Sequence, residues 1–128
     1  MIKTTKFMDN FYIFDDGMVR QFLITGEKEA LLIDAGFPGC HIRDAVSAVT
    51  DLPVSVIMTH GDMDRAGGLS EFGKCRLNKA DWKLVSGDIE LEPLAEGDVF
   101  ECGGYCLETI EIPGHTYGSV AFYDREKG

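Results

Sequence analysis

Apolar and polar positions divide the chain into short stretches, most of which have the pattern of β-strands. Short runs of mostly apolar residues that are bounded by turn residues predict strands. These runs are residues 11–14, 21–25, 30–34, 54–58, 74–77, 98–102, 105–112 and 119–123. The run at 54–58 is almost continuously apolar, which is typical of a strand that is buried on both faces.

Helical patterns lie between some of these strands. A helix is predicted from Ile42 to Val49, where apolar residues recur at helical spacing, and it should end before Pro53. Shorter helices are predicted at 69–72 and 79–85. The order of β-hairpins, one α–β step and further strands predicts a mixed sheet that is covered by helices on one side.

Length, charge and the N-terminus exclude several classes of protein. A chain of 128 residues is long enough for one domain with a core and too short for two. The formal net charge of −10 and the scattered Lys and Arg residues argue against a nucleic-acid partner. The sequence contains neither a signal peptide nor a stretch long enough to span a bilayer, so we expect a cytoplasmic protein without a membrane partner.

The four cysteines are interpreted as reduced thiols, because a chain of this size does not need disulfides for its core. Cys102 and Cys106 flank residues 103–105, the middle of a predicted hairpin. A zinc knuckle or a redox pair is an alternative, but the spacing matches neither common pattern. We therefore expect two strand cysteines that face each other.

Polar residues that could carry chemistry directly follow three of the predicted strands. Asp34, the segment 60–65 and His115 each occupy such a position. Strand ends at one edge of a layered fold are where binding groups converge. Glycines follow both histidines, among them Gly61 and Gly118, and should leave room beside the imidazole rings.

The segment after the buried strand has the composition of a metal-binding loop. His60, Asp62 and Asp64 offer one imidazole and two carboxylates at alternate positions. The alternative is an Asp-rich turn in which Asp64 caps the following helix. His41, which precedes the first helix, is interpreted as a solvated or capping residue rather than a ligand.

Three segments together resemble the first three motifs of the metallo-β-lactamase superfamily. They are residues 32–36, 58–68 and 112–119, in the order and at the spacing of that family. The resemblance covers essentially the whole chain. It implies an α+β fold, half of an αββα four-layer sandwich, with a mixed, mostly antiparallel sheet and flanking helices. Residues 1–128 would be a single partial domain, the N-terminal half of this fold.

The resemblance also implies roles for individual residues. His60 and His115 correspond to metal ligands, and Asp64 corresponds to the carboxylate of a second metal site. Asp62 stands at a ligand position where the family usually has His. Asp34 resembles the family's structural Asp, which supports the loops beneath the site.

Two departures from the family pattern affect the expected metal. Carboxylate can replace imidazole at Asp62, and two His with one carboxylate also suit iron. Arg65 stands where a second-site His is usual and would repel a cation. We therefore expect one zinc ion rather than two, with iron as the alternative.

The sequence lacks two later features of the family, a Gly-Asp motif and a final His, after His115. The last predicted strand also lacks a partner beyond it. We therefore expect a truncated domain that contains only the first half of the fold. Its exposed apolar face should drive homodimer formation or aggregation.

The function implied by the resemblance is metal-dependent hydrolysis of a small-molecule ester, thioester, lactone or lactam. A metal-activated water would attack, and Asp64 would be the catalytic residue that orients this water or accepts its proton. Little or no activity is expected of the 128 residues alone. The alternatives are a catalytically lost metal-binding or regulatory domain, suggested by Asp62 and Arg65, and an iron redox relative, against which Arg65 argues.

Overall fold

Two β-sheets and three short helices make up the computed structural model, which describes residues 2–17, 19–36, 39, 41–61, 66–85, 88–114 and 116–126. The elements in chain order are β1 (Lys3–Met8), β2 (Phe11–Asp15), β3 (Arg20–Thr25), β4 (Ala30–Ile33), α1 (Ile42–Ser47), β5 (Val54–Ile57), the 3₁₀ helix η1 (Gly67–Glu71), β6 (Lys74–Leu77), the 3₁₀ helix η2 (Lys79–Leu84), β7 (Glu90–Pro93), β8 (Val99–Cys102), β9 (Tyr105–Glu111) and β10 (Val120–Tyr123).

The first sheet has seven strands in the order β1-β2-β3-β4-β5-β6-β7. Its strand pairing changes from antiparallel to parallel at β4. The pairs from β1 to β4 are antiparallel and are joined by short turns. The pairs from β4 to β7 are parallel. Parallel neighbours need crossover connections, and these carry α1, η1 and η2. The carboxyl ends of β4 and β5 therefore lie side by side.

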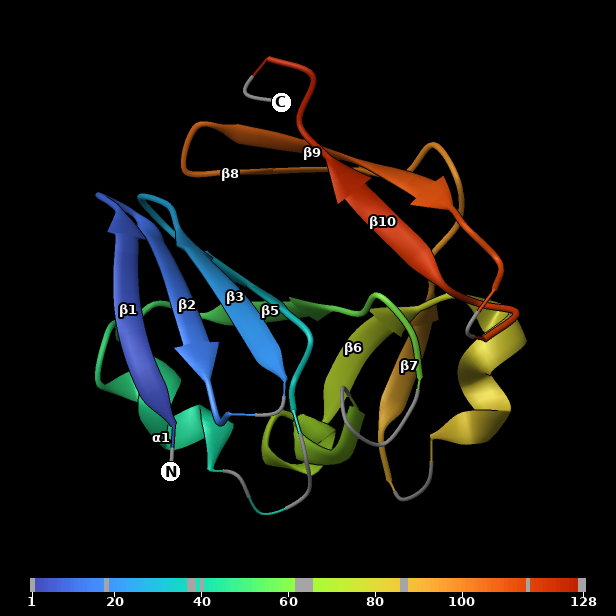
Figure 1. The fold of residues 1–128 in the computed structure, drawn as a ribbon, viewed down its shortest axis with the longest axis horizontal. Coiled ribbons are helices and arrows are strands. Elements are labelled where there is room, and N and C mark those ends of the chain that lie inside the picture. The colour runs from blue at the N-terminus through green and yellow to red at the C-terminus, as the bar shows by residue number, and fades with distance from the viewer. Residues whose placement is uncertain are drawn as a thin grey trace.

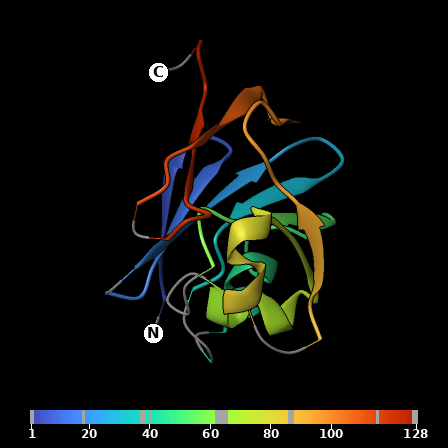
Figure 2. The same cartoon turned by 90° about the vertical axis from the view of Figure 1, so that its right-hand side faces the viewer.

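The helices and the second sheet cover opposite faces of the first sheet (Figures 1 and 2). On the helical face, Ile42 and Val46 of α1 pack with Leu23 and Leu32 in one buried cluster. The second sheet, in the order β10-β9-β8, faces the other side. There Leu107 belongs to a second buried cluster with apolar residues of β3, β4 and β5. The layers are thus helices, sheet and sheet.

Hydrogen bonds join the two sheets at several places, among them a junction at Gly103 and a junction at Val120. At one, the Asn10 side-chain amide donates to Thr25 O at 3.0 Å and to Gly103 O at 2.7 Å. The Cys102 thiol lies beside this contact, 3.5 Å from Ile24 O. The second junction lies at the start of β10, where a backbone N–H donates to the loop after β5.

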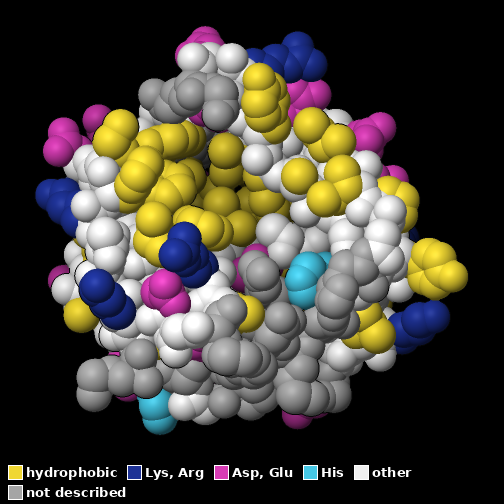
Figure 3. All heavy atoms as spheres, viewed as in Figure 1, with side chains coloured by type: hydrophobic (Ala, Val, Ile, Leu, Met, Phe, Trp, Pro, Cys, Tyr) yellow, Lys and Arg dark blue, Asp and Glu magenta, His cyan; other side chains and the backbone are white. Residues whose placement is uncertain are grey.

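Part of the apolar space between the sheets is open. Figure 3 shows hydrophobic side chains gathered around a hollow between the first and the second sheet. Large hydrophobic residues exposed on these sheets include Phe7, Met8, Val99, Ile110 and Tyr123. The expectation that such a face drives dimer formation or aggregation remains a prediction.

The structure confirms the predicted fold class and all eight predicted strands. It adds β1 and β7, which the apolar pattern did not predict, and it shows that the last three predicted strands form a separate second sheet. The helices predicted at 69–72 and 79–85 are the 3₁₀ helices η1 and η2. Among the described residues, no helix is both long and apolar enough to cross a membrane.

The expectation that Cys102 and Cys106 face each other is wrong. In the β8–β9 hairpin, Cys102 is opposite Tyr105, and Cys106 is opposite Glu101. Successive side chains of a strand point to opposite faces, so the shift by one residue separates the two thiols. Cys102 is buried between the sheets, whereas Cys106 is exposed.

The junction at Gly103 predicts a difference between two neighbouring glycines. Both have positive φ angles, but a Cβ on Gly103 would lie 2.4 Å from Asn10 Nδ2, whereas a Cβ on Gly104 would meet nothing within 4 Å. Gly104→Ala should lower the free energy of unfolding by about 1–2 kcal/mol, the cost of left-handed backbone. Gly103→Ala should cost about 1–3 kcal/mol more, because the side chain has no space.

Urea unfolding of the two variants beside the unsubstituted chain measures this difference. Equal losses of stability in Gly103→Ala and Gly104→Ala would show that the contact between the sheets at Gly103 contributes nothing.

Candidate functional site

The end of β4 provides a buried carboxylate. Asp34 is 0% exposed and has a left-handed φ of 68°. Its side chain accepts hydrogen bonds from Thr59 N at 2.8 Å and from Thr59 Oγ1 at 2.7 Å. The parallel pairing of β4 with β5 brings these two residues together. Asp34 thus supports the loop after β5, as the family resemblance implied.

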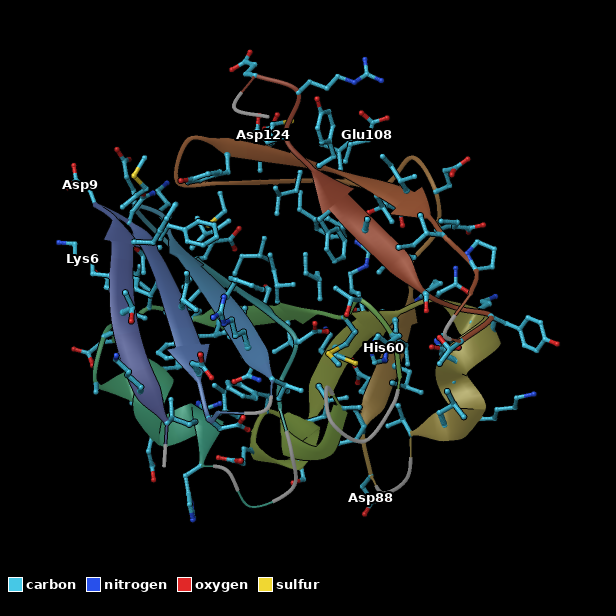
Figure 4. All side chains as sticks on the ribbon, in the orientation of Figure 1. Lys6, Asp9, His60, Asp88, Glu108 and Asp124 are labelled. Carbon is cyan, nitrogen blue, oxygen red and sulfur yellow. The ribbon has the colours of Figure 1, made fainter. Side chains whose placement is uncertain are left out.

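The loop after β5 carries His60, which lies between the end of β5, the start of β10 and η2 (Figure 4). The preceding residue, Thr59, also accepts a backbone hydrogen bond from Val120 N at 2.8 Å. The first sheet and the second sheet therefore meet directly beside His60. The histidine itself is partly buried.

A second buried carboxylate, Asp81, joins three segments of the chain. It lies on η2 and is 1% exposed. Its Oδ2 accepts hydrogen bonds from Gly61 N at 2.8 Å and from Thr116 Oγ1 at 2.6 Å. Its Oδ1 accepts from Gly118 N at 2.8 Å. One carboxylate thus holds the loop after β5 against the loop before β10.

The glycines beside the two histidines leave space for Asp81. A Cβ on Gly118 would lie 2.6 Å from Asp81 Cγ, and a Cβ on Gly61 would lie 3.0 Å from Asp81 O. The sequence suggested that these glycines make room beside the imidazole rings. Among the described residues, Asp81 is the nearest neighbour that a side chain at either position would meet.

The predicted ligands other than His60 fall outside the part of the chain that the structure describes. These are Asp62, Asp64 and His115, and Arg65 is outside it as well. Within the described ranges, no three His, Cys, Asp or Glu side chains form a potential metal site. The structure does describe residues on either side of these ligands, and the carboxylate of Asp81 holds the two loops together.

The donor chemistry of these loops suits a divalent cation. The two histidines can each provide a neutral nitrogen, and Asp62 and Asp64 can each provide a carboxylate. Asp34 and Asp81 accept hydrogen bonds from the loops, which accounts for these two carboxylates without a metal. His41 lies apart from this region at the start of α1, where it is exposed and makes no side-chain cap.

Comparisons with known proteins agree with the family resemblance of the sequence. Residues 14–74 match the family model of the metallo-beta-lactamase superfamily. A hydroxyacylglutathione hydrolase of Bdellovibrio bacteriovorus is 29% identical over 119 residues, which cover 89% of this chain and 46% of that protein. A probable metallo-hydrolase of Bacillus subtilis, YqgX, is 25% identical, with 82% and 60% covered. The chain spans about half the length of these relatives.

Solved structures share the fold. The Rm3 metallo-beta-lactamase superposes with a TM-score of 0.78 at 21% identity, over 93% of this chain and 55% of that one. A mutant flavo di-iron protein from Thermotoga maritima gives a TM-score of 0.77 at 19% identity, over 98% and 40%. The family model, the curated relatives and the solved structures all indicate the metallo-β-lactamase superfamily.

Within this superfamily fold, the sequence identified the loops of the site but not the residue that joins them. Asp81 lies in the short segment Asn78–Leu84, where it reads as one polar residue of a surface helix. Its partners are 20 to 37 residues away in the sequence. The one local signal is Asn78, whose side chain caps η2 and so fixes where the helix begins.

The contact between Asp34 and Thr59 predicts a stability difference between two substitutions. Thr59→Val removes the hydroxyl and leaves Asp34 Oδ2 without this donor, which should lower the free energy of unfolding by about 1.5–3 kcal/mol. Thr59→Ser keeps the hydroxyl and loses one methyl group, so it should cost less than about 1 kcal/mol. Urea unfolding tests both, and a Ser variant as unstable as the Val variant would contradict the role of the hydroxyl.

Proposed function

We propose that the protein hydrolyses a small thioester or ester with the help of one divalent metal ion held by His60, Asp62 and His115, with Asp64 as the catalytic residue. The observation that carries this proposal is the carboxylate of Asp81, which binds Gly61 and Thr116. These residues directly follow the two histidines in the sequence. A bond between the two histidine-bearing loops is what a site shared by both loops requires.

The residues of the chain would bind, orient and transfer protons. Asp34 and Asp81 hold the backbone on both sides of His60, which limits the positions that its imidazole can take. Asp64 would orient the attacking water and accept its proton. The bound ion would supply Lewis-acid activation of the substrate carbonyl and of the water.

The names of the relatives support a thioester as the substrate class. Several of the similar curated proteins, at 27–29% identity, are hydroxyacylglutathione hydrolases. The β-lactamase structures are less similar in sequence, at 16–21% identity, and bear on the fold alone. We therefore favour a thioester or ester over a lactam.

The proposed metal content is one zinc ion per chain, with iron as the alternative metal. Arg65 is permanently charged and stands at a family position of the second site. Asp62 adds a carboxylate to the first site, and two His with one carboxylate suit either metal.

Elemental analysis of the chain, purified without chelator or added metal, tests the site. The unsubstituted chain should contain about one zinc or iron ion, as a site with three protein ligands can. His60→Ala should lower metal content at least tenfold, because it removes an imidazole ligand. His41→Asn is the matched control, since His41 is exposed and Asn tolerates its left-handed backbone.

The control should retain the metal of the unsubstituted chain. Full metal content in His60→Ala, or none in the unsubstituted chain, would contradict the proposed site. Hydroxyacylglutathione hydrolysis, followed by thiol release, provides a second readout. We expect at most slow turnover by the 128 residues alone, and this turnover should disappear in His60→Ala and persist in His41→Asn.

A further inference from the structure

We propose that Asp81 is a positioning residue that sets the distance between the loop of His60 and the loop of His115, and thereby the affinity of the metal site. This inference rests on the proposed function, because it concerns the same site. It assigns a role to a residue that none of the three sequence motifs contains.

The first argument is the number and origin of the donors. A carboxylate that is 1% exposed accepts two hydrogen bonds from backbone N–H groups and one from a hydroxyl. Hydrogen bonds to an ionised acceptor are roughly twice as strong as neutral ones. The donors come from two loops, at Gly61 and at Thr116 and Gly118. Asp81 therefore connects the two loops to each other, whereas a carboxylate with donors from one loop would support that loop alone.

The second argument is the absence of free space. The carboxylate lies against Gly118 so closely that an added Cβ would be 2.6 Å from Asp81 Cγ. Gly61 is similarly close to the Asp81 backbone, at 3.0 Å. The three hydrogen bonds, at 2.6–2.8 Å, are already short, so the loops cannot move closer to Asp81, and moving them away would weaken these bonds. The spacing is fixed in both directions.

The third argument is how firmly Asp81 itself is held. Asn78 Oδ1 accepts from Ala80 N, and Asp81 N donates to Asn78 O. Trp82 Nε1 donates to Leu77 O of β6 at 2.8 Å. Asn78 Nδ2 reaches Leu94 O at 3.0 Å, just beyond β7. The helix that carries Asp81 is thus attached to two strands of the first sheet.

The fourth argument is proximity to the ligands. Gly61 lies between His60 and Asp62 in the sequence, and Thr116 directly follows His115. A change in either anchored residue is transmitted across one peptide bond to a ligand. Metal sites tolerate displacements of only about 0.5 Å before affinity falls.

Zinc titration of the metal-free chain against a chromophoric chelator tests the role. Asp81→Asn replaces one acceptor oxygen by an NH₂ group that faces donors, and should weaken zinc binding about 10- to 100-fold. Thr116→Val removes only the hydroxyl donor and should weaken zinc binding about three- to tenfold. Thr116→Ser keeps the hydroxyl and should bind zinc like the unsubstituted chain.

Gly103→Ala is the control for general destabilisation, because it disturbs the junction between the sheets at Gly103 rather than the contacts of Asp81. A purely structural role of Asp81 would lower stability equally with and without zinc, leaving the zinc-induced shift of the urea midpoint unchanged. A positioning role reduces this shift in Asp81→Asn and Thr116→Val, but not in Gly103→Ala.

The outcomes separate this inference from the proposed function. Zinc binding by the unsubstituted chain, with weakened binding in Asp81→Asn and Thr116→Val alone, supports both. Unchanged zinc affinity in the folded fraction of either variant overturns the role of Asp81 and leaves the metal site standing. If Asp81→Asn does not fold, the comparison of Thr116→Val with Thr116→Ser decides. No zinc binding by the unsubstituted chain overturns both.

Discussion

Two buried carboxylates hold the loops around His60, and the arrangement of the site depends on them. Asp34 accepts from the residue before His60, and Asp81 accepts from the residue after it. A buried carboxylate is costly unless its oxygens accept hydrogen bonds, and backbone N–H groups at strand ends need acceptors. Here the carboxylates provide the acceptors that the backbone N–H groups need, and the N–H groups provide the donors that the carboxylates need. The change of the first sheet to parallel pairing at β4 is what brings the first carboxylate to its partner.

Much of the fold follows from the sequence because buried strands have apolar runs. Residues 30–33 and 54–57, for example, lie in the sheet as the pattern predicts. Strand β1 was missed because it is exposed along its whole length, so no burial constrains its sequence. Strand β7 is mostly exposed as well and ends in Pro93. Both strands form because they pair with a neighbouring strand. The pattern of apolar residues in the sequence does not indicate this pairing.

The candidate site divides in the same way. The motifs around Asp34 and His60 were found because their residues are close together in sequence and follow strands directly. Asp81 was missed because its importance lies in three partners that only the folded chain brings to it. The Cys102–Cys106 interpretation failed for a related reason. The hairpin register, which the sequence does not specify to one residue, decides which side chains are opposite each other.

The junctions beside His60 also determine when the site can form during folding. The β1–β4 meander closes through short turns, whereas the bond of Val120 N to Thr59 O and the bonds of Asp81 join segments far apart in the chain. Contacts between distant segments carry a larger loop-closure entropy and form late. The two histidine-bearing loops therefore come together only after most of the chain has found its place. A metal ion at the proposed site would therefore meet both loops only late in folding, and a half-folded chain would offer it only separate, weak ligands.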